Sequence, residues 1–440
     1  MDGFQQKGLS EQSKALEGFV SKDDKPPYAD CPLSSTVIKS LDEDEKVLME
    51  ILKRCKKCCC RCFEWFVKSK CAVGNEDKDN AGRITQDEIW KMWGEGIDPP
   101  KSERIVIRDG KKITKKDDPQ GYHKWEGRKE KISGLTADVF AASCRGRSHA
   151  RSGKFRDDSF EIRYVKESDW YILAVADGAG SAKYSRKGSE IACRVSVKTI
   201  ESKIRSGVFG TDFEQDCSKI RLPPFGEAND NNDVRFFCGK HLYHVLAEAA
   251  VEARKEIVRE VEAMNKTPGQ SVLEKDYNTT ILLAVCKRLE SGEWFIGSFA
   301  IGDGIIAFYS PPPAAFDIMN VGDSGEYAGE TSFLTSKKVW DVSDDPNKII
   351  KRFKAVVIPQ FTALFLMTDG VSDAIFNTQS MLHDREVWDD FWKKLTKGDN
   401  PSFGKVDFRK KTAGTLLEWL GFKVPSYHDD RTLVVLLPHE

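Results

Sequence analysis

The feature that most constrains the fold of this chain is a short apolar segment that ends in an acidic residue followed by glycine. Short apolar runs bounded by Asp and Gly are typical of buried β-strands. The pattern occurs at 171–176 before Asp177-Gly178, at 295–302 before Asp303-Gly304, and at 364–368 before Asp369-Gly370. A fourth acidic pair, Asp429-Asp430, instead precedes the apolar run 432–437. The chain is therefore predicted to place several carboxylates at the ends of strands.

Carboxylates at strand ends can converge on one edge of a sheet, where the strands hold them rigidly and glycine lets a ligand approach the backbone. Oxygen-rich sites favour Mg²⁺ or Mn²⁺, and only 7 His are spread through the whole chain. A single Asp-Gly more often marks a turn between strands. Three copies and the acidic pair near the C-terminus favour a site for hard cations over unrelated turns.

The chain changes in character near residue 131. From 132 to 440, short apolar runs alternate with helical patterns at 188–203 and 240–264, which predicts an α+β domain. The segment 205–237 is polar and rich in Gly, Pro, Asn and Asp, so we expect an irregular surface insertion there. We place the domain boundary between residues 131 and 132.

Residues 1–131 form a separate, mostly helical N-terminal region of unknown role. A polar lead-in over 1–35 precedes a predicted amphipathic helix at about 42–68, and a charged linker ends the region. Seven of the 12 Cys lie in the first 71 residues, and their spacing fits an apolar helix stripe better than a zinc site, because a second paired CxxC is missing.

Two further patterns occur in the N-terminal region. Residues 77–88 resemble a calcium-binding loop, but Ala81 removes one expected oxygen ligand, so a plain polar turn is the alternative. Asp109-Gly110 between two short apolar segments predicts a β-hairpin.

The overall charge gives no reason to expect a nucleic-acid or membrane partner. Lys and Arg total 68 and Asp and Glu total 69, so the formal net charge is -1. The longest uncharged apolar-rich run, 355–368, contains Pro359 and is too short to span a bilayer. The N-terminus lacks the pattern of a secretory signal, so we expect a cytoplasmic protein.

The order of short motifs along the chain resembles the metal-dependent protein phosphatase family, the PPM or type 2C Ser/Thr phosphatases. The sequence DGAGSAKYS after the first strand resembles a bacterial-like branch of that family. The resemblance implies a four-layer αββα sandwich, in which two packed antiparallel β-sheets are flanked by helices. The matching blocks are 156–160, 174–185, 278–280, 300–304, 366–376 and 428–437.

The resemblance also implies a set of metal ligands. Asp177 is similar to the carboxylate that bridges two metal ions, and the Gly178 carbonyl completes one coordination shell. The expected ligands around these two are Asp369 and Asp429 at the first metal, Asp157 and Asp158 near the second, and Asp303 and Asp373 at a weaker third ion found in many members. Thr279 and Thr280 are expected to serve packing rather than chemistry.

Two family positions are not matched. Ala179 stands where many eukaryotic members have a histidine that serves as general acid, and the family's phosphate-contacting arginine is not cleanly placed. His149 is our candidate proton donor, with a structural role as the alternative. Arg151, followed by Arg156, is the candidate for contacting phosphate, and a solvated surface charge is the alternative.

The implied function is hydrolysis of phosphoserine and phosphothreonine by a water bound to two Mg²⁺ or Mn²⁺ ions. The expected partners are a phosphorylated protein substrate and a protein that binds the N-terminal region. One alternative is a catalytically weak or inactive phosphatase-fold module that regulates or binds through its N-terminal region. Two others are a phosphatase gated by calcium at residues 77–88 and a phosphatase acting on a small phosphorylated metabolite.

Overall fold

The structure is a computed structural model that divides the chain into two compact units, Met1–Arg83 and Ile84–Glu440. The predicted helix at 42–68, the cysteine cluster and the calcium-like loop at 77–88 lie outside the described residues. These described residues are 106–108, 111–113, 127–146, 148–149, 154–222, 231–312, 314–320, 331–376, 378–398, 404–422 and 427–439.

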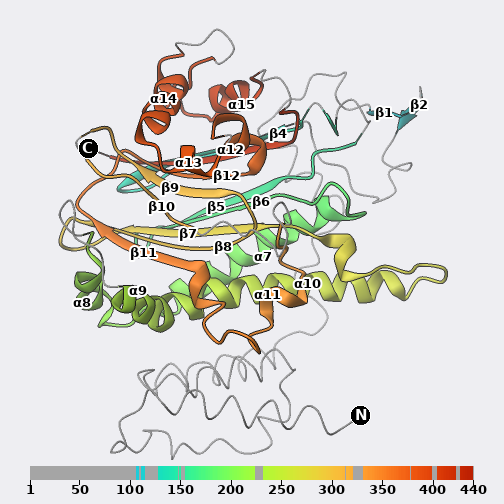
Figure 1. The fold of residues 1–440 in the computed structure, drawn as a ribbon, viewed down its shortest axis with the longest axis horizontal. Helices are drawn as coiled ribbons and strands as arrows, with labels where there is room; N and C mark the ends of the chain where they lie inside the picture. Colours follow the sequence, from blue (N-terminus) through green and yellow to red (C-terminus); the bar gives the residue numbers. More distant parts are fainter. Residues whose placement is uncertain are drawn as a thin grey trace, which may run out of the picture. The chain divides into compact units, whose positions relative to one another are not determined.

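Two antiparallel sheets form the centre of the second unit (Figure 1). The first sheet has the strand order β10 (Asp317–Ile318), β9 (Ile305–Tyr309), β12 (Ala363–Met367), β13 (Arg431–Pro438), β4 (Ala137–Cys144) and β3 (Gly127–Ser133). The second has the order β11 (Phe353–Ile358), β8 (Trp294–Ile301), β7 (Ile281–Arg288), β6 (Trp170–Ala176) and β5 (Ser159–Val165).

The strands of the second sheet are buried on both faces. Every residue of β6 is buried, although a strand with one face in water would alternate between apolar and polar residues. Leu173 and Val175 belong to the core between the two sheets, together with Leu364 and Val434 of the first sheet. This double burial explains why the strands appear in the sequence as continuous apolar runs.

Helices cover the outer faces of both sheets (Figure 1). On the second sheet they are α7 (Ser185–Arg205) and α10 (Glu248–Asn265), which continues the π-helical η3 (Cys238–Ala247). On the first sheet they are α12 (Asp369–Ile375), α13 (Gln379–Leu382), α14 (Arg385–Thr396) and α15 (Gly414–Leu420). The predicted four-layer αββα sandwich is confirmed.

The helices over the first sheet are held by a second apolar core. Trp388 and Phe391 of α14 and Trp419 of α15 are almost completely buried against Phe365 of β12. The indole N–H of Trp388 donates to the Leu382 carbonyl at 2.8 Å, so burial leaves this polar atom paired.

The prediction of an irregular insertion at 205–237 was wrong for much of the segment. The segment forms α8 (Phe213–Cys217), the 3₁₀ turn η2 (Ser218–Ile220) and α9 (Asn231–Phe237). Phe209 stacks on Trp170 of β6 with ring centroids 4.3 Å apart, and Phe213 packs edge-on against Phe295 of β8 at 5.1 Å. The five phenylalanines in this polar stretch were the signal for a docked segment.

The remaining elements are short. β1 (Val106–Arg108) and β2 (Lys111–Ile113) pair antiparallel, which confirms the predicted hairpin. The strand β3 begins at Gly127, so the first sheet already includes residues that we assigned to the linker before 131. The short helices η4 (Glu274–Tyr277), α11 (Lys337–Trp340) and η5 (Ile350–Arg352) lie in connections between strands and helices.

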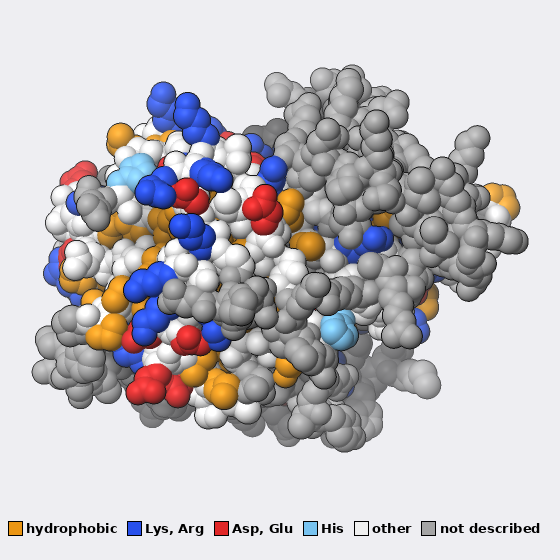
Figure 2. All heavy atoms as spheres, turned by 90° about the horizontal axis from the view of Figure 1, so that it is seen from above, with side chains coloured by type: hydrophobic (Ala, Val, Ile, Leu, Met, Phe, Trp, Pro, Cys, Tyr) orange, Lys and Arg blue, Asp and Glu red, His pale blue; other side chains and the backbone are white. Residues whose placement is uncertain are grey.

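The surface carries both signs of charge. On the face seen in Figure 2, Lys and Arg side chains are interspersed with Asp and Glu, in keeping with the nearly balanced composition. Within the part of the chain that the structure describes, no helix is long and apolar enough to cross a membrane.

Candidate active site

The predicted acidic residues come from separate strand ends. They are Asp157 and Asp158 before β5, Asp177 after β6, Asp303 after β8, Asp369 and Asp373 on α12, and Asp429 before β13. The antiparallel pairing Met367↔Leu433 brings the end of β12 and the start of β13 to the same edge of the first sheet. The fold therefore explains how Asp369 and Asp429, far apart in sequence, become neighbours.

Electrostatic coupling shows that the carboxylates form one cluster. Burial raises the pKa of Asp177 well above its usual value, and the charges of Asp369, Asp158 and Asp429 raise it further. Burial likewise raises the pKa of Asp369, with added repulsion from Asp303, Asp158, Asp429 and Asp373. Each acid thus makes it harder for its neighbours to hold a negative charge.

Three acids of the cluster have no Lys or Arg ion-pair partner in the part of the chain that the structure describes. Among the described residues, no Lys or Arg forms an ion pair with Asp177, Asp369 or Asp429, although many surface carboxylates of this domain are paired. Buried carboxylates of like charge are stabilised by a bound cation or by protonation. Oxygen donors without sulfur suit Mg²⁺ or Mn²⁺, so the residues present fit the metal ions that the sequence predicts.

Two threonine hydroxyls hold one carboxylate oxygen of Asp158 in place. Its Oδ2 accepts hydrogen bonds from the hydroxyls of Thr368 at 2.8 Å and Thr432 at 2.7 Å. Burial and the charge of Asp430 raise the pKa of Asp158 to about 7, although a hydrogen bond with Asp177 opposes the shift. Sequence reasoning missed the two threonines, whose positions directly before Asp369 and two residues after Asp430 were the available signal.

Thr279 and Thr280 hold the backbone at Asp177. The Thr279 hydroxyl donates to the Asp177 carbonyl at 2.8 Å, and the Asp177 N–H donates to the Thr280 hydroxyl at the same distance. A Cβ added to Gly178 would lie 2.8 Å from the Ser185 carbonyl and 2.9 Å from the Asp157 carbonyl. Glycine is therefore needed for the close approach of these segments.

Asp430 is a site residue that sequence analysis did not separate from Asp429. Its Oδ1 accepts from the Gly146 N–H at 2.6 Å, and its Oδ2 accepts from the Asp157 N–H at 2.5 Å and faces His149 Nδ1 at 2.9 Å. Burial opposes its charge, but the hydrogen bond and charge of His149 hold the pKa of Asp430 below its usual value. This carboxylate joins three segments of the chain beside the cluster.

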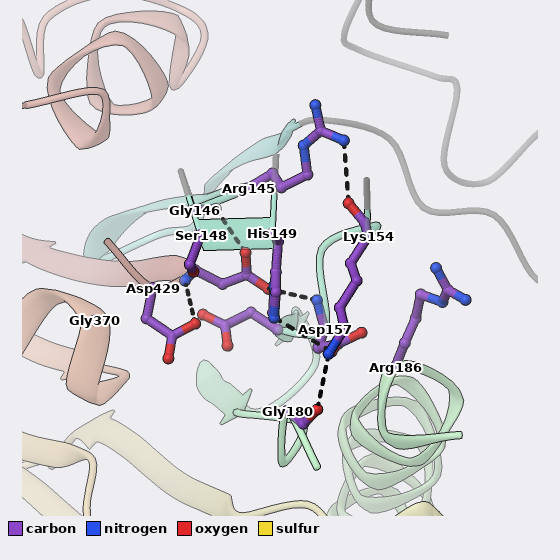
Figure 3. Close-up of polar contacts among 12 residues, drawn as sticks. Arg145, Gly146, Ser148, His149, Lys154, Asp157, Gly180, Arg186, Gly370 and Asp429 are labelled. Carbon is purple, nitrogen blue, oxygen red and sulfur yellow. Dashed lines mark hydrogen bonds and ion pairs between the residues drawn. The ribbon is translucent and has the colours of Figure 1, made fainter. Parts of the chain in front are cut away.

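His149 lies at the cluster, as the sequence predicted. Its Nε2 is 3.7 Å from Asp157 Oδ2, and Figure 3 shows its ring between Asp429 and Asp157. Burial favours the neutral ring, but Asp430, Asp157 and Asp429 together raise the pKa of His149 to about 9. In the metal-free protein the ring is therefore positively charged at neutral pH.

The structure describes only one of the two arginines that we proposed to contact phosphate. Arg151 lies outside the described residues. Arg156 is buried, and burial lowers its pKa to about 10 against the opposing charges of Asp430 and Asp158. At the rim, Lys154 Nζ donates to the Gly180 carbonyl at 3.1 Å, and the Arg186 guanidinium stacks on the Phe155 ring at 4.7 Å (Figure 3).

The raised pKa values predict that the metal-free protein loses stability as pH rises. Asp158 shifts from 3.8 to about 7 and His149 from 6.5 to about 9, so both groups bind protons more tightly in the folded state. Each group's contribution to the stability of the folded state is fully present below its unfolded-state pKa. That contribution is lost as the pH rises through its folded-state pKa. We expect the melting temperature in EDTA to fall from pH 5 to pH 9, roughly the window of these shifts.

Thermal unfolding with and without Mn²⁺ measures this effect. Stabilisation by the ion should grow with pH, because fewer protons compete for the carboxylates. Asp177→Asn removes one coupled acid and should flatten the pH dependence. A melting temperature in EDTA that rises over the same window would contradict the prediction.

The site geometry agrees with the comparisons to known proteins. The family model "Protein phosphatase 2C" matches residues 145–403, more than half of the chain. None of the curated proteins matches significantly.

Several solved structures are similar to this chain. RsbX in complex with magnesium is 11% identical, with a TM-score of 0.34 over 71% of this chain and 100% of that chain. A serine-threonine phosphatase 2C from Toxoplasma gondii is 16% identical, with a TM-score of 0.40 over 71% and 99%. The PPM Ser-Thr phosphatase MsPP from Mycobacterium smegmatis in complex with cacodylate is 14% identical, with a TM-score of 0.27 over 69% and 99%.

The family match begins at Arg145 and includes the acidic block at 157–158 and the strand-end carboxylates Asp177, Asp303 and Asp369, whereas the acidic pair at 429–430 lies beyond its end. The motif order, the two-sheet fold and the family model agree. The chain belongs to the protein phosphatase 2C family of metal-dependent Ser/Thr phosphatases.

Proposed function

We propose that this chain is a catalytically active phosphatase that removes phosphate from phosphoserine and phosphothreonine in proteins. The observation that carries the proposal is the acidic cluster of Asp177, Asp369 and Asp429, in which burial and the charges of the neighbouring acids raise the pKa of Asp177 and of Asp369, and in which no Lys or Arg among the described residues pairs with these three. Clustered acids with raised pKa values are typical of catalytic sites.

The proposed ligands divide by position among the ions, with Asp157 and Asp158 near the second. Asp177, with the Gly178 carbonyl, would lie between two Mg²⁺ or Mn²⁺ ions, and Asp369 and Asp429 would complete the first. Asp303 and Asp373 would hold a third, weaker ion, and the charge of Asp303 already contributes to the raised pKa of Asp373. Two divalent ions in such a site would lower the pKa of a bound water and neutralise the phosphoryl oxygens.

The protein's own residues keep this site in shape. Thr279 and Thr280 fix the Asp177 backbone, and Thr368 and Thr432 fix Asp158. Thr432 lies in β13, and the other three threonines adjoin β7 or β12, so rigid strands hold these hydrogen bonds in place. Lys154, whose ammonium group reaches the Gly180 carbonyl, places positive charge near the Asp177 loop, where a phosphate monoester would enter.

The proposal also covers the cellular compartment of the protein and the role of its N-terminal region. The described cysteines Cys144, Cys193, Cys217, Cys238 and Cys286 form no disulfide with one another, which suits the reducing cytoplasm. We further propose that residues 1–131 bind a protein partner. Affinity capture with the intact chain, compared with a chain that lacks residues 1–105, would test for such a partner.

Phosphate release tests the proposed activity. The intact protein should hydrolyse a phosphothreonine peptide with Mn²⁺ or Mg²⁺ and stop in EDTA, and a sugar phosphate should react much more slowly. Faster turnover of the sugar phosphate would favour a metabolite phosphatase. A folded protein that binds Mn²⁺ but releases no phosphate from either substrate would favour the inactive binding module.

A further inference from the structure

The hydrogen bonds of His149 fix the orientation of its ring. The 2.9 Å contact joins its Nδ1 to Asp430 Oδ2. The same carboxylate accepts the backbone N–H groups of Gly146 and Asp157, so it acts here as an acceptor for all three groups. The ring therefore carries a hydrogen on Nδ1 and turns Nε2 toward the acidic cluster.

The other ring nitrogen is well placed to meet a cation. Nε2 lies 3.7 Å from Asp157 Oδ2, beyond hydrogen-bonding distance. Donor atoms of His149, Asp429 and Asp430 lie within 4.8 Å of one another, and Figure 3 shows His149, Asp157 and Asp429 close together. Two ligands of one ion at about 2.1 Å are separated by about 3 Å when adjacent and about 4.2 Å when opposite. The Nε2 to Oδ2 distance falls within this range.

Asp430 itself is not suited to ligation. Both of its oxygens already accept backbone N–H groups, and it is only 2% exposed. Its contact with Nδ1 instead matches the arrangement in which a carboxylate orients a metal-binding histidine through the nitrogen that does not bind. The ion that meets His149 Nε2 is then the one that Asp157 helps to hold, with Asp429 close by.

We propose that His149 is a nitrogen ligand of the metal centre, oriented by Asp430 as a positioning residue, instead of the proton donor that the sequence suggested. The inference rests on the proposed metal centre of this phosphatase. One imidazole among carboxylates makes the centre favour Mn²⁺, Fe²⁺ or Co²⁺ over Mg²⁺, because imidazole binds transition metals more strongly than it binds Mg²⁺. The metal preference is therefore a property of this chain's own residues.

Pulsed electron paramagnetic resonance of the Mn²⁺-loaded full chain tests the ligand directly. We expect modulation from a directly bound imidazole ¹⁴N, which shifts to the ¹⁵N pattern after labelling with [¹⁵N]histidine. His149→Gln keeps a group that can hydrogen-bond Asp430 but should abolish the nitrogen signal. His428→Gln is the matched control, because exposed His428 directly precedes Asp429 and is the alternative source of an imidazole.

Metal affinity tests the positioning role of Asp430. Asp430→Asn keeps one acceptor oxygen, which serves either the Gly146 N–H or the Asp157 N–H and His149 Nδ1, and it removes the carboxylate charge beside His149. Changes of this kind weaken metal binding about 10- to 100-fold, and the loss should be larger for Mn²⁺ than for Mg²⁺ in calorimetric titrations. Equal losses for the two ions would show a purely structural effect and would overturn the positioning role.

The outcomes separate this inference from the proposed activity. Phosphate release with bound Mn²⁺ but no nitrogen modulation would overturn the ligand role and leave the phosphatase intact. Nitrogen modulation in a protein that releases no phosphate would support the ligand and contradict the activity. Modulation that survives in His149→Gln but disappears in His428→Gln would move the ligand to His428 and also overturn the proposal.

Discussion

Replacing Asp177 by Asn should abolish metal-dependent phosphate release, and Asp369→Asn should have a similar effect. Both changes keep the shape of the side chain but remove an anionic donor from the centre of the cluster. An ion at such a site contributes several kcal/mol of transition-state stabilisation, so we expect a loss of about a thousandfold or more in kcat/KM. Initial rates of phosphate release from a phosphothreonine peptide at saturating Mn²⁺ would measure it.

The same variants should be at least as stable as the parent in EDTA. Asp177 is destabilised by burial and by the charges of Asp369, Asp158 and Asp429, so removing its charge relieves repulsion in the metal-free protein. Lost activity together with unchanged or higher stability distinguishes the loss of a metal ligand from damage to the fold. Asp169→Asn is the matched control, since Asp169 precedes the opposite end of β6 and its positive φ of 53° is a conformation that Asn tolerates. Normal activity in Asp177→Asn would refute the assignment.

The second large effect should come from Gly370→Ala. A Cβ at this position would lie 1.8 Å from the Asp430 carbonyl oxygen and 3.4 Å from the Asp429 carbonyl carbon. Both obstacles are backbone atoms, so the start of α12 must move away from the segment before β13 (Figure 3). The shift separates Asp369 from Asp429, and a displacement of about 1 Å can cost a hundredfold in rate.

Titration of Mn²⁺ binding and of kcat would measure the effect of this substitution. The apparent affinity should fall together with the rate, because the change disturbs two ligands of one ion. Gly404→Ala is the control, since Gly404 is exposed and a Cβ there would meet no atom within 4 Å. Unchanged metal affinity and rate in folded Gly370→Ala would mean that the close approach at α12 does not hold the site together.

Much of the site could be predicted because local sequence patterns mark its residues. Asp177, Asp303 and Asp369 each follow an apolar run, and a strand that is buried on both faces has a clear sequence pattern. The helices α7 and α10 also follow from their periodicity. These features depend on residues that are neighbours in sequence, so pattern reasoning can find them.

The features that were missed depend on contacts between distant segments. Asp430 joins Gly146, His149 and Asp157, and no spacing within the sequence distinguishes this role from that of adjacent Asp429. The polar composition of the segment at 205–237 led us to expect an irregular surface insertion. Instead, Phe209 of this segment stacks on Trp170. In both cases tertiary packing assigns a role that local composition does not encode.

The most direct test of the metal centre is an anomalous difference map at the manganese edge from crystals of the protein grown with Mn²⁺. We predict strong peaks on either side of the Asp177 carboxylate, with one peak also contacting Asp369 and Asp429. Manganese bound elsewhere, with none beside Asp177 in a protein that hydrolyses the phosphopeptide, would contradict the account of this cluster as the catalytic centre.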